Sequence, residues 1–243
     1  EHYVPGQMIL SAAGAVDHAQ IVRQAEVLFG HLPSAPLIAP SKALFKGGED
    51  RRIKDLEQAH FALGFDSPGY QESEIYTAQI YSVAFGGGMS SRLFQEVREK
   101  RGLCYSIFAQ TEAYADSGMT TIYAGTGEDQ LAELMTITLD EMHRAADDMN
   151  DQEVARARAQ MKAGMLMGLE SPSSRGERLA RMVQVWGRVK SLDEVVEQID
   201  AVTTADVRQF AANLVSKAPA AMALYGPVAK GPTLDALKSR NAA

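Results

Sequence analysis

The segment from Phe85 to Tyr105 constrains the fold more than any other part of the sequence. An apolar stretch ends there in a run of glycines, Gly86–Gly88, which suits a turn with unusual backbone dihedral angles. Ser90 or Ser91 is then placed to cap a new helix, whose first N–H groups need an acceptor. Gly102 is placed to end that helix in the left-handed region. The segment therefore predicts a turn, a helix and a sharp stop.

The predicted helix and the strand that follows it carry the candidate functional residues. Leu93 and Val97 fall on one apolar face at helical spacing, and Leu103–Gln110 alternates as a strand does. Arg98 then lies near the end of the helix and Tyr105 at the start of the strand, so the two side chains can converge on one site. The alternative, which spacing alone favours, is that Arg98 pairs with a surface carboxylate and Tyr105 packs in the sheet.

Local motifs for phosphate binding, nucleophilic catalysis and metal binding are missing from the sequence. The glycine run lacks the Lys-Ser/Thr of a P-loop, and no G-x-S-x-G follows it. No two histidines are spaced by three to five residues, so no helical or zinc-finger ligand pair exists; they are His2, His18, His31, His60 and His143. His60 is predicted to be a satisfied core or sheet histidine. The residues alone predict neither a metal site nor hydrolytic chemistry.

Composition indicates an ordinary globular protein and excludes several partners. The 243 residues are 46% hydrophobic and 23% charged, and the formal net charge of −7 argues against nucleic acid as the main partner. No membrane span is expected from the short apolar runs. Cys104 is the only cysteine, so no intramolecular disulfide is expected, and a buried structural thiol is favoured over a nucleophile. The cytoplasm is favoured, and the mitochondrial matrix and the periplasm stay open.

Changes in composition divide the chain into four parts. Residues 1–32 are predicted to be a short strand, over 8–15, and a helix, whereas 33–42 contains Pro33, Pro36 and Pro40 and is predicted to be a linker. Residues 43–228 form the main domain, and 229–243 a flexible tail.

The main domain is predicted to be α+β, with a mostly antiparallel sheet and helices packed on one face. Its strands are expected over 44–46, 56–65, 103–110, 118–126 and 221–225, with charged residues 47–52 separating the first two. Helices are expected over 71–85, 129–148, 151–169, 174–189, 192–199 and 205–215. Asp129, Asn150, Ser191 and Thr203 or Thr204 are the candidate helix caps.

The residues Gly86-Gly87-Gly88-Met89-Ser90-Ser91-Arg92-Leu93-Phe94, with Val97-Arg98-Glu99-Lys100-Arg101-Gly102-Leu103 and Tyr105, resemble a signature of the pitrilysin/insulinase family of zinc metallopeptidases, near the mitochondrial processing peptidase branch. Each domain of that family is a sheet with helices on one side, and two such domains form a clamshell around an extended peptide. The resemblance implies that residues 1–32 are the closing strand and helix of a truncated catalytic-type domain. Residues 43–228 would then be the second, non-zinc domain.

The resemblance also implies where zinc lies. In this family an H-x-x-E-H helix and a distant glutamate of the first domain hold the zinc, and the glutamate within the motif activates water. The present sequence has no H-x-x-E-H. It is therefore expected to be a C-terminal portion that holds no metal or cofactor and is inactive alone, with zinc in the parent protein or in a partner subunit.

Arg98 and Tyr105 match, in spacing and context, an arginine and a tyrosine that the second domain of active members contributes across the cleft. The resemblance implies that Tyr105 hydrogen-bonds the scissile carbonyl as its oxyanion develops, and that Arg98 orients the substrate or Tyr105. The expected function is the substrate-clamping half of a zinc metalloendopeptidase. The expected partners are the catalytic N-terminal domain or a partner subunit and the peptide substrate, and a homodimer is an option. The alternative is a non-catalytic scaffold or peptide-binding subunit of the same family.

Overall fold

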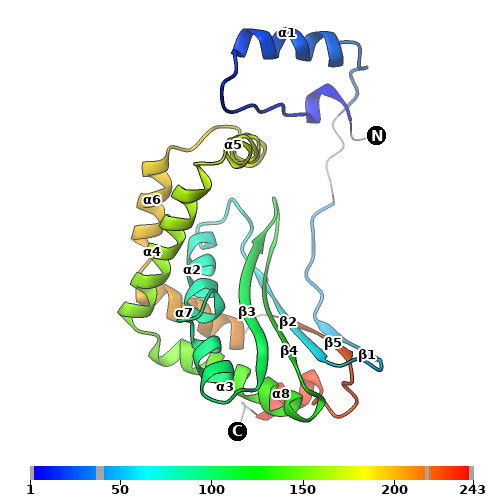
Figure 1. Ribbon diagram of the computed structural model, residues 1–243, viewed down its shortest axis with the longest axis vertical. Coiled ribbons are helices and arrows are strands. Elements are labelled where there is room, and N and C mark those ends of the chain that lie inside the picture. The colour runs from blue at the N-terminus through cyan, green and yellow to red at the C-terminus, as the bar shows by residue number, and fades with distance from the viewer. Residues whose placement is uncertain (1–2, 37–40, 217–218, 241–243) are drawn as a thin grey trace. The chain divides into compact units, whose positions relative to one another are not determined.

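The computed structural model describes residues 3–36, 41–216 and 219–240 (Figure 1). The chain separates into two compact units: residues 1–42 with 162–195, and residues 43–161 with 196–243. The second unit is the larger one and contains the sheet. Within the described residues, no helix is both long enough and apolar enough to cross a membrane.

The second unit is built on a five-stranded sheet. Its strands, in spatial order, are β1 (Gly48–Ile53), β5 (Ala220–Gly226), β2 (Ala59–Ser67), β4 (Gly118–Thr126) and β3 (Cys104–Ala113). β1 and β5 pair in parallel, and the other neighbours pair antiparallel. The predicted hairpin of β3 and β4 is confirmed, with Phe108 opposite Tyr123. β3 and β1 are the two edges of the sheet.

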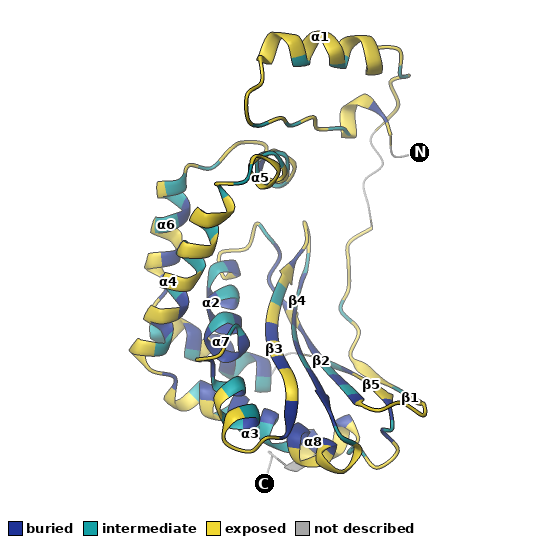
Figure 2. Cartoon of the chain, in the orientation of Figure 1, coloured by how far each residue is buried: buried dark blue, intermediate teal, exposed yellow. Residues whose placement is uncertain are grey.

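Helices pack on one face of this sheet (Figure 1). The helical elements of the unit are α2 (Ile75–Gly86), the π-helical turn η2 (Phe94–Glu99), the 3₁₀ turn η3 (Glu128–Gln130), α3 (Leu131–Asp148), the first part of α4 (Asp151–Gly168), the last part of α6 (Leu192–Ala201), α7 (Thr204–Ser216) and α8 (Leu234–Arg240). Buried side chains of β2 and α2, such as Phe61, Tyr81 and Phe85, form the core between sheet and helices. β3 alternates between buried and exposed residues along much of its length (Figure 2). The predicted α+β class is confirmed.

The first strand differs from its prediction. A strand was expected over 44–46 and a charged separator over 47–52, but β1 is that charged segment itself. Tertiary contacts satisfy its charges: the Glu49 carboxylate accepts from the backbone N–H of Leu234 at 2.8 Å, and the Arg51 guanidinium donates to the Gly231 carbonyl at 2.7 Å. An edge strand tolerates charged residues when such partners exist.

The unusual backbone dihedral angles predicted for the glycine run are not observed, and Gly86 is required for a steric reason instead. None of Gly86–Gly88 has a positive φ, but a Cβ at Gly86 would lie 2.3 Å from the backbone nitrogen of Ala109 on β3. Gly102, with φ of 63°, ends the helical segment as predicted. The capping prediction was wrong for Ser91, because its buried hydroxyl has no hydrogen-bond partner within the described part of the chain.

Part of the predicted flexible tail forms a helix. α8 lies within 229–243 and buries Leu234 and Leu237. The predicted helix cap at Asn150 is confirmed, since its side chain accepts from the N–H of Glu153 at 3.1 Å. Residues 241–243 lie outside the described residues.

The first unit contains α1 (His18–Phe29), the end of α4, α5 (Pro172–Trp186) and the start of α6. Asp17 caps α1 by accepting from the N–H of Gln20 at 2.7 Å. The strand predicted over 8–15 has no partner strand among the described residues and belongs to no sheet. Of the predicted linker, residues 37–40 lie outside the described residues.

Candidate functional site

The helical segment that carries Arg98 is a π-helical turn. Leu93 and Val97 anchor it in the core, where both are fully buried as predicted. The backbone N–H of Lys100 donates to the Gln95 carbonyl, five residues earlier, at 3.0 Å. π-helical turns are rare and occur frequently at functional sites.

Charged groups fasten the end of this turn. The Glu96 carboxylate accepts from Lys100 Nζ at 2.5 Å and from Arg101 Nη1 at 3.0 Å. The hydrogen bond from Lys100 is the main reason that the pKa of Glu96 is lowered. These ion pairs join residues on both sides of Arg98 in the chain.

Arg98 is half-buried, and its guanidinium stacks over an aromatic ring. The guanidinium carbon lies 4.4 Å from the centroid of the Phe94 ring. A cation this close to a ring face is attracted by the ring quadrupole. Arg98 is thus directed along the surface of the turn by its own helical neighbour.

Tyr105 lies in a β-bulge at the start of β3. Cys104 pairs with Thr126 on β4, but the next pair joins Ser106 to Gly125, so Tyr105 is an extra residue. A bulge of this kind re-aims a side chain, and the Tyr105 side chain is 83% exposed. Beside the bulge, the Thr126 hydroxyl donates to the Leu103 carbonyl at 2.5 Å. The Tyr105 hydroxyl has no hydrogen-bond partner among the described residues and is accessible to a ligand.

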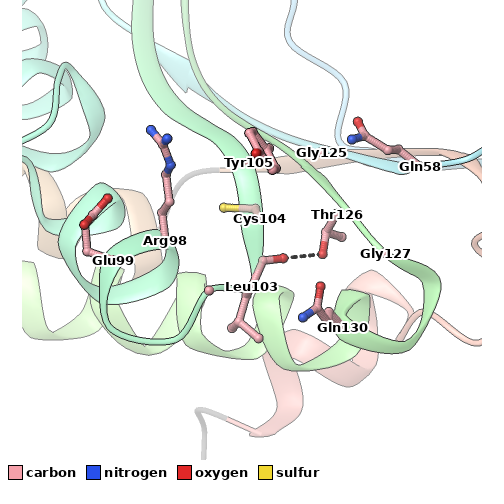
Figure 3. A pocket seen from close by; sticks show the side chains of 11 residues that line it. Gln58, Arg98, Glu99, Leu103, Cys104, Tyr105, Gly125, Thr126, Gly127 and Gln130 are labelled. Atoms are coloured by element: carbon pink, nitrogen blue, oxygen red, sulfur yellow. Dashed lines mark hydrogen bonds between the residues drawn. The ribbon is translucent and has the colours of Figure 1, made fainter.

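Arg98 and Tyr105 both line one hollow, here named the Tyr105 hollow (Figure 3). Its volume is about 350 Å³. The other residues of its lining come from the start of β2, the end of η2, the β3 bulge, the end of β4 and η3: Gln58, Glu99, Gly102, Leu103, Cys104, Gly125, Thr126, Gly127 and Gln130. The structure therefore brings the two residues singled out in the sequence to the wall of a single concavity.

Cys104 is buried beside this hollow, as predicted from its place at a strand start. Burial raises the pKa of its thiol to about 11, and the nearby charge of Arg98 only partly offsets that effect. A thiol with such a pKa stays protonated at neutral pH and is a poor nucleophile.

Comparison with protein families decides the classification. The family described as "Peptidase M16 inactive domain" matches residues 1–161, which is more than half of the chain. The chain belongs to the M16 peptidase family. The relation to zinc metallopeptidases that the Gly86–Tyr105 signature predicted is confirmed.

Individual M16 relatives agree with this classification. An uncharacterized zinc protease of Rickettsia bellii is 38% identical over 228 residues, which cover 93% of this chain and 55% of the relative. One of Streptomyces coelicolor is 35% identical, covering 94% and 52%, and one of Bacillus subtilis is 34% identical, covering 96% and 57%. The chain spans about half the length of these relatives.

A solved structure supports the M16 fold. A chain of complex III2 from Candida albicans, with Inz-5 bound, superposes with a TM-score of 0.80. The match has 22% sequence identity and covers 92% of this chain and 56% of that one. At this identity the likeness establishes the fold alone.

The residues present do not fit a zinc ion. The sequence contains no H-x-x-E-H, and within residues 3–36, 41–216 and 219–240 no cluster of three or more His, Cys, Asp or Glu is arranged to hold a metal. His60, predicted to be a satisfied sheet histidine, is half-buried on β2, and its Nδ1 lies 2.8 Å from the Tyr123 hydroxyl. The zinc named in the relatives therefore has no ligand set in the described part of this M16 chain.

Sequence reasoning missed the rest of the hollow. Gln58 and Gln130 precede β2 and α3, and no local motif marks them. The alternate glycines Gly125 and Gly127 at the end of a strand were the available signal, because glycine in a strand often marks a close approach or an opening. The contact of the Phe94 ring with the Arg98 guanidinium was also not predicted.

Proposed function

We propose that this chain is the C-terminal, non-zinc-binding half of an M16 zinc metalloendopeptidase, and that it supplies Arg98 and Tyr105 to the hydrolysis of peptide bonds. The observation that carries the proposal is that both residues line the Tyr105 hollow, one from a π-helical turn and the other from a β-bulge. Two separate backbone irregularities position the two side chains. Irregularities of this kind occur next to active sites.

The chemistry of the two side chains suits a developing oxyanion. The exposed Tyr105 hydroxyl donates a hydrogen bond to the carbonyl oxygen of the scissile bond, and this bond strengthens as negative charge grows there. The Arg98 guanidinium is always charged and adds positive potential at the same wall. It orients the substrate carbonyl or the Tyr105 hydroxyl.

The metal and the water-activating glutamate belong, in this proposal, to the other half of the protease. That half lies on the same chain of the parent protein or on a partner subunit. The present chain then contributes one wall of the cleft that clamps an extended peptide, and it does not hydrolyse peptides alone.

A second candidate is a non-catalytic scaffold or peptide-binding subunit of the M16 family. The lack of H-x-x-E-H in this chain is the observation that favours it. The two candidates differ in what the full-length product of the gene does with zinc and peptide.

The first test is to measure the zinc content and the cleavage of a quenched fluorescent peptide, for this chain and for the full-length product. Zinc-dependent cleavage by the longer product alone is expected. Lack of both zinc and cleavage in the longer product would favour the scaffold.

The second test substitutes Tyr105→Phe in the full-length product. Turnover is expected to fall about 100-fold or more, because one oxyanion donor is worth that much. Thermal stability is expected to stay unchanged, since the side chain is 83% exposed. Tyr114→Phe is the matched control, because Tyr114 is also exposed but does not line the hollow. Equal turnover of Tyr105→Phe and Tyr114→Phe would remove Tyr105 from the chemistry.

A further inference from the structure

We infer that the Tyr105 hollow binds the main chain of an extended peptide through the side-chain amides of Gln58 and Gln130. The inference rests on the proposed function, because it names what the wall beside Tyr105 holds. Both glutamines line the hollow away from Arg98, with Thr126 between them in the view of Figure 3.

The two amides are available for a ligand. Both residues are exposed, and neither side-chain amide makes a hydrogen bond with another residue in the described part of the chain. By contrast, two exposed glutamines outside the hollow use their amides: Gln110 Nε2 donates to Glu112 at 3.2 Å, and Gln160 Nε2 donates to the Gly87 carbonyl at 3.0 Å. Both amides therefore keep unused donors and acceptors at the wall of the hollow.

The side-chain amide of each of these two glutamines lies next to a glycine of the wall. A Cβ at Gly125 would lie 3.1 Å from Gln58 Oε1, and a Cβ at Gly127 would lie 3.5 Å from Gln130 Oε1. Each amide oxygen thus lies close to a backbone position that has no side chain. Any larger residue at position 125 would push Gln58 aside and narrow the hollow.

The spacing of these glycines matches the repeat of an extended peptide. Gly125 lies one residue before the end of β4, and Gly127 has extended angles, with φ −74° and ψ 154°. Two residues of extended chain span about 6.5–7 Å. A peptide that runs alongside in an extended conformation presents an N–H and a C=O at the same interval, one pair for each glutamine.

The chemistry of the lining favours main chain over a charged side chain. A glutamine amide offers two donors and acceptor lone pairs, which complement a peptide N–H and C=O. The charged groups of the wall, Arg98 and Glu99, have opposite signs. A volume of about 350 Å³ lies at the low end of ligand pockets, about 300–1,000 Å³, and suits a short piece of chain rather than a folded domain.

The test uses the 243-residue chain and the blocked peptide acetyl-tetra-alanine amide, which offers main chain with minimal side chains. Nuclear magnetic resonance would follow the side-chain NH₂ signals of Gln58 and Gln130, assigned by their loss in Gln58→Leu and Gln130→Leu. Saturable shifts of both signals are expected, and each Leu variant is expected to raise the Kd about 2- to 10-fold. Gln110→Leu, outside the hollow, is the matched control and is expected to bind as the unmodified chain does.

Two further measurements keep the result decisive. Gly125→Ala retains both amides but crowds Gln58, so it is also expected to weaken binding. The same peptide methylated on its backbone nitrogens is expected to lose the shifts. Unmoved glutamine signals, an unchanged Kd in both Leu variants, or equal binding of the methylated peptide would overturn the inference.

Kinetics of the full-length product separate this inference from the proposed function. Gln58→Leu and Gln130→Leu are expected to raise KM with little change in kcat, as the loss of uniform binding does. Tyr105→Phe is expected to lower kcat instead. An inactive full-length product would contradict the proposed function, and the peptide titration of the 243-residue chain would still decide the role of the glutamines.

Discussion

The guanidinium carbon of Arg98 lies 4.4 Å from the centroid of the Phe94 ring, four residues earlier in the same π-helical turn. The ring holds the charged group at the wall of the Tyr105 hollow. Phe94→Leu is expected to keep the fold and to free the guanidinium. A cation–π contact at a partly exposed site is worth about 0.5–1 kcal/mol, so the kcat of the full-length product should fall about 2- to 5-fold. Steady-state kinetics with a quenched peptide measure this.

Phe94→Tyr is the control for this prediction, because it retains the aromatic face and should retain turnover. In an Arg98→Ala background, Phe94→Leu should have no additional effect on kcat. An equal loss from Phe94→Leu with and without Arg98 would mean that the ring acts independently of the arginine.

Gly86 is expected to be intolerant of any side chain. A Cβ there would lie 2.3 Å from the backbone nitrogen of Ala109, and backbone atoms on a paired strand have little room to move. Gly86→Ala should lower the free energy of unfolding by about 1–3 kcal/mol or more, as overpacking does. Gly164→Ala is the matched control within α4, where nothing lies within 4 Å of the added Cβ. It should stabilise the chain by about 0.5–1 kcal/mol. Urea denaturation of both variants distinguishes these opposite signs.

Arg92 joins the helical segment to α3 through Asp148 and to α4 through a largely buried ion pair with Glu153. Its Nε donates to Glu153 Oε1 at 2.6 Å, and their side chains are 10% and 13% exposed. Arg92→Met would leave the Glu153 charge without this partner, so the free energy of unfolding should fall by about 3–5 kcal/mol. Arg52→Met is the control, since Arg52 and its partner Asp50 are 69% and 65% exposed and such pairs are worth about 0–1 kcal/mol. Similar losses of unfolding free energy in both variants would contradict the conclusion that the buried Arg92–Glu153 pair stabilises the fold more than the exposed Arg52–Asp50 pair.

Asp148, the second partner of Arg92, makes stability depend on acid pH. Partial burial opposes its charge, but the hydrogen bond and charge of Arg92 outweigh burial and lower its pKa below 3.8. Its contribution is therefore fully present above pH 3.8 and is lost as the pH falls through the lowered value. Asp148→Asn should flatten the fall of stability below about pH 4, measured by urea denaturation at several pH values. An unchanged acid slope would show that Asp148 does not contribute to it.

Cys104 should resist alkylation in the folded chain. Burial raises the pKa of its thiol from 9.0 to about 11, so at pH 8 the thiolate fraction is about 100-fold lower than in the unfolded chain. Iodoacetamide should therefore react at least that much more slowly with folded protein than in urea. Because the folded thiol keeps its proton while the unfolded thiol loses it, its contribution to stability declines as the pH rises above about 9. Equal rates with and without urea would contradict a buried thiol.

Elements with strong local signals agree with their predictions. The bounds of β4, 118–126, are those expected, because an alternating apolar run lies between a glycine and a polar turn. The cap of α4 at Asn150 also follows from local chemistry, since Glu153 lies three residues later and reaches back to the Asn150 N–H at 2.9 Å. The prediction misplaced β1 because this strand is mostly charged and shows no alternation of apolar and polar residues. Its parallel partner β5 lies more than 160 residues away.

In the candidate site, too, the residues marked by local sequence were predicted and those brought together by tertiary structure were not. Arg98 and Tyr105 were found because they belong to a contiguous signature with a family resemblance. Gln58 and Gln130 were missed because they follow no motif and line one hollow only when β2, β4 and the start of α3 assemble. The bulge at Tyr105 was also missed, because it arises from the pairing of Cys104 and Ser106 with β4 rather than from the local sequence.

The sequence by itself determined the family and the α+β class and singled out Arg98 and Tyr105 as candidates, because periodic apolar residues and a contiguous signature are local properties of the chain. Only the tertiary structure decided why Gly86 must be glycine, how Tyr105 is exposed and which residues complete the hollow. Each of these depends on backbone segments that are distant in sequence, and their approach is set by strand pairing and by packing of helices on the sheet.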